Sequence, residues 1–206
     1  MMTIILIAFT TLISIQSFYN SAWSAKLQFN PYQIYHRKEL YRLLTHGFLH
    51  ANWMHLIVNM LVLYYFGRFA EDALAQILPS GLARLNLLIF LFFYLAAVII
   101  ASLPSLFKHK DNVWYNAVGA SGAVSAVMFF FIFFNPWELL WFYGIIPLPG
   151  IVMGALYLIY SQVMIKRGGD NINHDAHFTG AIFGFIFPLI INYRLFSVFI
   201  DRLLSF

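Results

Sequence analysis

The sequence predicts an all-α, polytopic membrane protein, in which six transmembrane helices form one bundle and a long first loop lies at the membrane interface. Of the 206 residues, 62% are hydrophobic and only 10% are charged, whereas soluble domains carry roughly 25% charged residues. Apolar segments of membrane-spanning length recur along the chain, and a span needs about 20 such residues. One long connection interleaves aromatic with basic residues, which is typical of the headgroup region.

Six apolar segments are the predicted spans: approximately residues 1–19, 54–69, 85–103, 118–134, 150–165 and 178–193. The first has no basic residue ahead of it and no small-x-small cleavage site close behind it, so we expect a retained helix rather than a signal peptide. Residues 194–206 form an amphipathic tail that we expect on the membrane surface. With no repeat or low-complexity stretch, residues 1–206 are predicted to be a single membrane domain.

The connections between the spans differ in character. Residues 20–52 mix basic and aromatic side chains, so we expect short interfacial helices there. Residues 105–115 and 166–175 are polar loops. Residues 136–149 are apolar but are broken by proline and glycine, so we expect a re-entrant or interfacial turn rather than a seventh span.

Composition excludes several kinds of site and partner. The chain has no cysteine, which excludes disulfides and thiolate metal sites. Its formal charge of +4 is spread over the loops without a basic run, which argues against a nucleic-acid partner. His46 and His50 are four residues apart and could bind a metal, but Gly47 interrupts them and no carboxylate accompanies them. We therefore favour structural hydrogen bonds there and expect no metal or cofactor.

Polar residues recur at similar depth in three of the spans. Because consecutive spans alternate in direction, the second, fourth and sixth enter the membrane from the same side. His55, Ser121 and His177 each lie within about the first turn of one of these spans. Asn59 shares a face with His55, because residues four apart align on a helix. Polar groups at membrane depth are costly and are functional candidates by default.

Small residues allow two of these spans to approach closely. Gly119 and Gly122 give the fourth span a thin face, and Gly180 and Gly184 form a GxxxG pair on the sixth. If these faces meet, the Ser121 hydroxyl and the histidine at the start of the sixth span come within hydrogen-bonding reach. That contact is the geometric requirement for a nucleophile activated by a base.

Peptide hydrolysis by serine needs a base for the hydroxyl proton and donors for the tetrahedral oxyanion. His177 is the predicted base, the Ser121 N–H is free to donate at a helix N-terminus, and His55 and Asn59 are side-chain donors. Asp175 precedes the base by two residues and should point elsewhere, so we predict a Ser-His dyad with an acyl-enzyme intermediate. Taken singly, a Gly-x-Ser-Gly in a membrane helix is more often a packing face, but the shared depth favours catalysis.

The chain resembles the rhomboid family of intramembrane serine proteases, in its bacterial six-helix form. The matching residues run in order from about Glu39 to Gly184. They are Tyr41-Arg42, near the family's Trp-Arg pair; His46 and His50; His55-Leu-Ile-Val-Asn59; Gly67-Arg-Phe-Ala-Glu71, like the family's Gly-x-x-x-Glu; Gly119-Ala-Ser121-Gly122; and Ala176-His177-Phe-Thr-Gly180-Ala-Ile-Phe-Gly184.

This resemblance implies a rhomboid-like bundle, a serine-type endopeptidase in the bacterial plasma (inner) membrane, and substrates that are themselves transmembrane proteins. Ser121 would be the nucleophile, His177 the general base and acid, and His55, Asn59 and the Ser121 N–H the oxyanion hole. The fifth span and the loop before the sixth would form a lateral gate and cap. The implied supporting positions are Tyr41, Arg42, His46, His50, Glu71, Gly119, Gly122, Gly180 and Gly184.

Two positions depart from the family pattern. Bacterial relatives carry a tyrosine four residues after the nucleophile, and its ring stacks on the catalytic histidine. This chain has Ser125 there, so the His177 ring needs another support, for which Tyr115 or a phenylalanine is the candidate. Tyr41 stands where the family has tryptophan.

Two arguments oppose each other on the orientation in the membrane. The resemblance implies cytoplasmic termini and a site on the outer side. Positive charge normally concentrates inside, yet the outer loops would carry more Lys and Arg than the inner ones. The outer set is Lys26, Arg37, Lys38, Arg42, Lys108, Lys110, Lys166 and Arg167, and the inner set is Arg68, Arg84, Arg194 and Arg202.

Other function classes fit less well. An aspartyl or metal intramembrane protease needs an Asp within a span or a His-Glu-x-x-His motif, and the sequence has neither. A transporter or channel predicts inverted repeats and paired broken helices. A catalytically impaired rhomboid-like chaperone or adaptor, which binds transmembrane helices, predicts loss of Ser121 or His177. Both residues are present, and this class is the alternative function.

Overall fold

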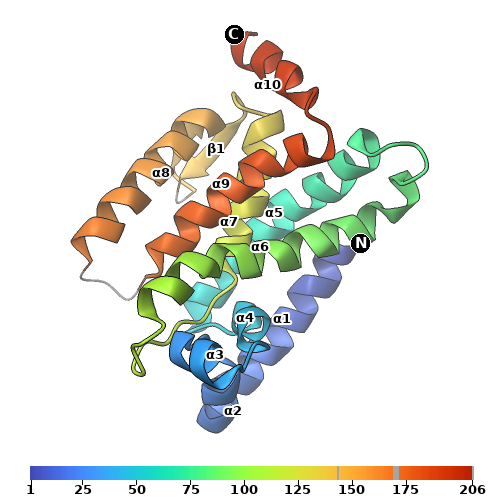
Figure 1. Ribbon diagram of the computed structural model, residues 1–206. Helices are drawn as coiled ribbons and strands as arrows, with labels where there is room; N and C mark the ends of the chain where they lie inside the picture. The colour runs from blue at the N-terminus through green and yellow to red at the C-terminus, as the bar shows by residue number, and fades with distance from the viewer. Residues whose placement is uncertain (143, 169–171, 206) are drawn as a thin grey trace.

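The computed structural model describes residues 1–142, 144–168 and 172–205. Within these residues the chain is mostly helical, and each predicted span overlaps one long helix (Figure 1). Parts of three predicted segments, at residues 143, 169–171 and 206, lie outside the described residues. The long helices are α1 (Met2–Tyr19), α5 (Trp53–Ile77), α6 (Asn86–His109), α7 (Ser121–Phe134), α8 (Gly150–Arg167) and α9 (His174–Ile191).

Hydropathy distinguishes these helices from one another. Among the described residues, Met2–Tyr19, Ala83–His109 and His174–Ile191 are long and apolar enough to cross a membrane, and α7 is a shorter apolar helix. The other two long helices, α5 and α8, carry charged residues in their second halves. The protein is therefore a helical membrane bundle with at least three helices of spanning character.

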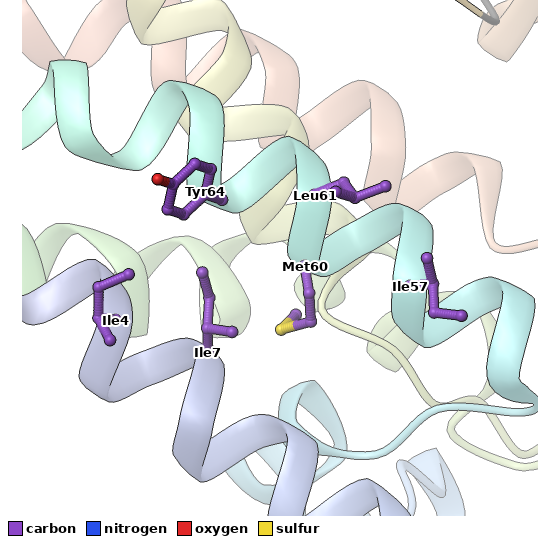
Figure 2. Close-up of a pocket in the computed structure, with 6 residues that line it drawn as sticks. All are labelled: Ile4, Ile7, Ile57, Met60, Leu61 and Tyr64. Carbon is purple, nitrogen blue, oxygen red and sulfur yellow. The ribbon is translucent and has the colours of Figure 1, made fainter.

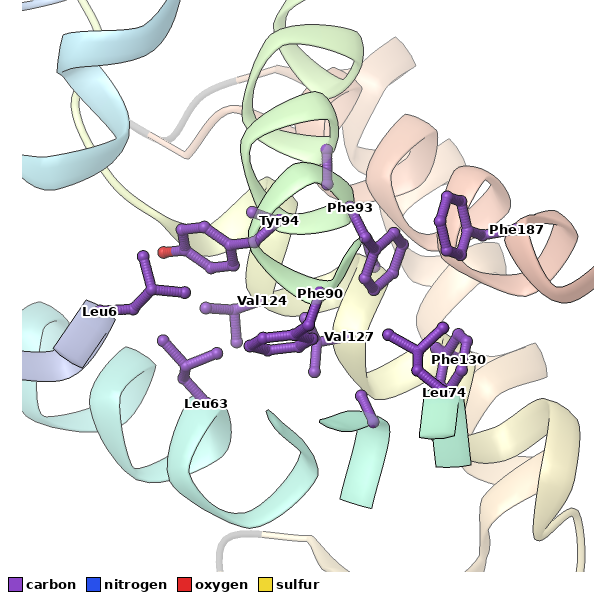
Figure 3. Close-up of a cluster of buried hydrophobic side chains, with 14 of the residues drawn as sticks. Leu6, Leu63, Leu74, Phe90, Phe93, Tyr94, Val124, Val127, Phe130 and Phe187 are labelled. Carbon is purple, nitrogen blue, oxygen red and sulfur yellow. The ribbon is translucent and has the colours of Figure 1, made fainter. Parts of the chain in front are cut away.

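Helix α7 is the centre of the bundle. Eleven of its 14 residues are buried, as expected of a helix that is apolar on every side. Phe130 packs against Phe93 of α6 and Phe187 of α9, and the Phe93 and Phe187 rings stack with 4.3 Å between their centroids (Figure 3). The first residue of α7 is Ser121, so this core fixes the helix that carries the serine.

Helices α7 and α9 meet at their small residues, as the sequence predicts. A Cβ added at Gly180 would collide with the backbone carbonyl of Gly122, and one added at Gly184 would collide with that of Ala126. The two backbones are therefore in direct contact, which only glycine on α9 permits. We call these four residues the α7–α9 seam.

The first loop folds into the short helices that its composition predicts: α2 (Ser21–Leu27), α3 (Pro31–Arg37), α4 (Arg42–Thr45) and a 3-10 turn, His46–Phe48. The side chains of Asn20 and Asn30 cap α2 and α3 by accepting backbone N–H groups. Phe29 forms an isolated β-bridge with Ala117. The first loop is thereby joined to the segment that leads into α7.

The structure differs from the sequence-based expectations in several places, among them α6, which continues to His109 rather than ending near residue 103. Residues 139–149 form an antiparallel hairpin of β1 (Leu139–Phe142) and β2 (Ile146–Pro149) rather than a re-entrant turn, so the fold is not purely α. A two-stranded ribbon has only edge strands, and edge strands tolerate proline. Helix α5 continues to Ile77, well beyond the predicted end at residue 69, and its buried Glu71 accepts hydrogen bonds from the backbone N–H and hydroxyl of Thr3 on α1.

The tail after α9 forms α10 (Leu195–Leu204), which packs on the far end of α7 from Ser121. Phe199 stacks on Phe133 with 5.2 Å between ring centroids. Arg202 donates to the carbonyl of Phe134 and so satisfies the C-terminal end of α7.

Candidate functional site

Gly119 determines where Ser121 lies at the start of α7. Its φ of +134° belongs to a region that L side chains rarely adopt. Its N–H donates to the carbonyl of His46 at 3.0 Å, which ties the residue to the first loop. A Cβ added at Gly119 would also lie 2.7 Å from Cε1 of His55. Only glycine fits this backbone conformation and this gap beside the imidazole.

Ser121 and His177 are in direct contact. The distance from Ser121 Oγ to His177 Nε2 is 2.7 Å, between residues 56 positions apart. His177 lies in the first turn of α9, where the side chain of Asn173 caps the helix by accepting the Ala176 N–H at 3.1 Å. With the imidazole protonated on Nδ1, Nε2 accepts the hydroxyl hydrogen, which is the geometry of a nucleophile beside its base.

The His177 ring is flanked by Tyr157 of α8, a residue that the sequence analysis missed. The two rings are 6.1 Å apart and within 19° of parallel. The Tyr157 hydroxyl is 2.5 Å from Ser125 Oγ, and Ser125 in turn donates to the Ser121 carbonyl at 2.8 Å. The expectation for Tyr115 is wrong: its ring stacks on His109, with 3.9 Å between centroids. No spacing in the sequence distinguished Tyr157 from Tyr160, the other tyrosine of α8.

The His55 ring lies beside the same serine. A Cβ on Gly119 would be 3.0 Å from His55 Nε2 and 3.8 Å from Ser121 Oγ, so the imidazole and the hydroxyl border one small space. Asn59 is buried one turn further along α5, and its amide donates to the His55 carbonyl at 2.9 Å. An amide nitrogen carries two hydrogens, so this bond uses one of the two. The structure brings His55 to Ser121 and places Asn59 directly below it.

His46 and His50 make buried hydrogen bonds within and around the first loop. His46 Nδ1 lies 2.8 Å from the Arg42 carbonyl, and His50 Nδ1 lies 2.9 Å from Ser14 Oγ of α1. Burial lowers the pKa of His46 to about 4, against a raising effect of the bond to Arg42. Burial, and secondarily the nearby His55, lowers the pKa of His50 to about 3. Both rings are therefore neutral near pH 7 and act as structural hydrogen-bonding groups.

The remaining supporting residues join chain segments together. Arg42 is buried and donates to Glu39 at 2.6 Å and to the carbonyls of Ala25 and Gln28 at 2.8 and 2.9 Å. Tyr41 donates to the same Glu39 carboxylate at 3.1 Å.

The carboxylate of Asp175 has a partner on another helix. It pairs with Lys108 at the end of α6, with 3.0 Å between the charged atoms. This pair fastens the start of α9 to α6.

An apolar groove lies between α1 and α5, apart from this cluster (Figure 2). Its volume is about 320 Å³ and its lining side chains are Ile4, Ile7, Ile57, Met60, Leu61 and Tyr64. None of them belongs to the Ser121–His177 cluster, and the groove offers hydrocarbon contacts rather than a reacting group.

Comparison with known proteins relates this chain to the rhomboid family. A family profile described as "Rhomboid domain" matches residues 37–194. RHOMBOID-like protein 12, mitochondrial, of Arabidopsis thaliana is 30% identical over 157 residues, which cover 69% of this chain and 44% of that protein. Rhomboid-related protein 2 of Mus musculus is 28% identical over 177 residues, covering 82% and 52% respectively. The chain spans about half the length of these curated relatives.

The profile covers most of the chain, from the end of α3 to the end of α9, and therefore every residue of the cluster around Ser121. Together with the order of the motifs along the helices, this match shows that the chain belongs to the rhomboid family of membrane proteins.

Proposed function

We propose that this protein is an intramembrane serine endopeptidase that cleaves transmembrane segments of other membrane proteins. The observation that supports this most directly is the 2.7 Å separation of Ser121 Oγ and His177 Nε2. Membership of the rhomboid family is consistent with this activity. The proposed reaction uses the side chains and backbone of this chain without a metal or cofactor.

The proposed mechanism begins when His177 Nε2 takes the Ser121 hydroxyl proton as the oxygen attacks the scissile carbonyl. The resulting oxyanion accepts hydrogen bonds from the Ser121 N–H, His55 and Asn59. The imidazolium then protonates the leaving amine, which frees one product and leaves an acyl-enzyme ester on Ser121. In the second half a water molecule gives its proton to His177 and attacks the ester, and the imidazolium then returns the proton to Ser121 Oγ as the acid product leaves. Each oxyanion donor contributes about 100- to 1,000-fold in rate.

The depth of Ser121 supports a membrane-embedded substrate. With 14 residues at 1.5 Å each, α7 is about 21 Å long, shorter than the ~30 Å hydrocarbon core. If α7 ends near one membrane face, Ser121 lies below the opposite face, at the level of a substrate's helix. In this proposal all six long helices cross the membrane, and α8 with the loop before α9 forms the gate and cap. The membrane is proposed to be the bacterial plasma membrane.

The proposal is tested with purified protein in detergent and a model single-span substrate. Ser121→Ala and His177→Ala should each abolish cleavage, and Ser121→Ala should also abolish labelling by a fluorophosphonate. Ser197→Ala and His36→Ala, at exposed positions away from the cluster, are the matched controls and should retain full activity.

Undiminished cleavage in either active-site variant, or labelling that survives Ser121→Ala, would overturn the proposal. A wild-type protein that binds the substrate helix but never cleaves it would instead indicate the alternative, a catalytically impaired chaperone or adaptor.

A further inference from the structure

We propose that Tyr157 is the positioning residue that orients the His177 imidazole, and that Ser125 fixes Tyr157 in place. The inference rests on the proposed function and adds to it a dependence of the dyad on helix α8. The described contacts of Tyr157 are with His177, Ser125 and Phe129, so its role is to act through His177.

The rings of Tyr157 and His177 are suited to stacking. Their centroids are 6.1 Å apart and their planes differ by 19°, within the range of offset-stacked aromatic pairs. Phe129 of α7 packs on Tyr157 at 5.7 Å with a tilt of 50°, so the tyrosine ring is held between α7 and α9. His174 approaches the His177 ring at 5.9 Å and is nearly perpendicular to it. Together these contacts restrict rotation of the imidazole about its side-chain bonds.

The direction of the hydrogen bond between Tyr157 and Ser125 follows from the number of hydrogens available. Ser125 has one hydroxyl hydrogen, and the Ser121 carbonyl at 2.8 Å can only accept. Ser125 therefore donates to this carbonyl, and Tyr157 donates to Ser125 Oγ at 2.5 Å. The ring that supports the base is thus connected through two hydrogen bonds to the peptide of the nucleophile.

Ser125 is also small enough to leave room for this arrangement. It lies one turn after Ser121 and is buried where α7 faces α8. A larger side chain at position 125 would occupy the space of the Tyr157 hydroxyl. The pair of a serine on α7 and a tyrosine on α8 therefore acts as a unit.

The position of α8 makes this support adjustable. Only Gly150, Gly154 and Ser161 are buried among the 18 residues of α8, and the helix lies at the edge of the bundle (Figure 1). An outward movement of α8 would separate Tyr157 from His177. It would leave the contact between Ser121 and His177 in place, because these residues lie on α7 and α9. The His177 ring is then fully oriented only when α8 is packed against α7. A substrate that displaces α8 on entry therefore lowers the activity of the base until α8 packs against α7 again.

The test compares Tyr157→Phe, Tyr157→Leu and Ser125→Ala with Tyr65→Leu, an exposed tyrosine on α5, as the matched control. Two rates are measured: cleavage of a single-span substrate and labelling by a small fluorophosphonate, which needs no displacement of α8. Tyr157→Leu should lower kcat about 10- to 100-fold with little change in KM, because misplacing a catalytic group costs rate rather than binding. Labelling should slow in parallel, and the acidic limb of the pH–rate profile should shift.

Tyr157→Phe keeps the ring but loses the hydrogen bond that fixes it, so it should lower kcat about fivefold, less than Tyr157→Leu, and Ser125→Ala should have the same effect. These two changes break the same hydrogen bond, so the double variant should be no slower than either single variant. The comparison of the double variant with the single variants also tests the inference if Tyr157→Leu fails to fold.

Wild-type kcat and labelling rate in Tyr157→Leu, or additive losses in the double variant, would overturn the inference. A wild-type enzyme without Ser121-dependent activity would overturn the proposed function instead, so the two failures are distinguishable.

Discussion

The α7–α9 seam and the contact of α8 with α7 position the same serine and histidine in two different ways. On the seam, glycines bring two backbones together, and an added Cβ at Gly180 or Gly184 would strike a carbonyl. At α8, the contact is made by the side chains of Phe129 and Tyr157, and an added Cβ at Gly154 would meet only side-chain atoms, the nearest at 3.2 Å. Backbone contact allows one arrangement, whereas side-chain ends can adjust. The distance between Ser121 and His177 is therefore fixed, and the orientation of the histidine ring is adjustable.

Breaking the seam should have the largest effect. Gly184→Ala places a methyl group against the Ala126 carbonyl, and overpacking of this kind costs about 1–3 kcal/mol or more. We expect a large fall in the thermal unfolding midpoint and loss of fluorophosphonate labelling. Gly154→Ala adds the same methyl group on α8 and should cost less than about 1 kcal/mol, since neighbouring side-chain ends can shift. Equal losses of stability in Gly184→Ala and Gly154→Ala would contradict the difference between a rigid seam and an adjustable α8 contact.

Acid should weaken the rigid part of the site through the first loop, where the His46 carbonyl holds Gly119. The pKa of His46 is lowered to about 4 by burial, so folding favours its neutral form. Its contribution to stability is complete above pH 6.5 and is lost progressively as the pH falls towards 4. By pH 5 the loss should approach about 2 kcal/mol. His46→Asn, which does not titrate, should flatten the pH dependence of unfolding; an unchanged dependence would contradict this assignment.

Restraining α8 should affect substrate entry without affecting the dyad. The chain has no native cysteine, and a Cβ at Gly150 would lie 3.4 Å from Cγ1 of Ile132, so Ile132→Cys with Gly150→Cys should form a disulfide. Oxidation should lower cleavage of a membrane-embedded substrate at least about tenfold, with recovery on reduction. Labelling by the small fluorophosphonate should continue. Equal cleavage by the oxidised and reduced forms would show that α8 need not move.

The pair of Lys108 and Asp175 should have the smallest effect. The Lys108 side chain is 47% exposed, and exposed ion pairs contribute about 0.2–1 kcal/mol. Lys108→Ala should therefore change the unfolding midpoint only slightly, and less so at high salt. Lys26→Ala, at an exposed position in the first loop, is the control. A loss comparable to that of Gly184→Ala would mean that this pair, rather than the seam, holds α9 in place.

The sequence was sufficient to bring Ser121 and His177 together because their convergence depends on two coarse properties. The alternating direction of the long helices brings the starts of α5, α7 and α9 to one end of the bundle, and the small residues at positions 122, 180 and 184 identify the faces that meet. Both properties are readable as patterns along the chain. His55 follows from the same argument, since it lies at the start of a span that enters from the same side.

Finer features depended on helix rotation and loop conformation, which the patterns do not specify. Tyr157 reaches His177 only because of how α8 is rotated against α7, while Tyr115 turns towards His109. The bonding of Glu71 on α5 to Thr3 on α1 likewise depends on how the two helices are rotated against each other. The hairpin after α7 was missed because the apolar sequence from residue 139 to 149 is compatible with a strand as well as with a membrane-inserted turn.

The order of the helices also sets a time at which the protein can become active. Ser121 and His177 are 56 positions apart, and synthesis at about 5–20 residues/s separates their emergence by about 3–11 s. Until α9 is inserted, the partly made chain holds a serine that lacks its base. On the proposed function, a chain whose α9 has not yet entered the membrane cannot cleave its neighbours, and peptidase activity begins only after α9 has packed against α7.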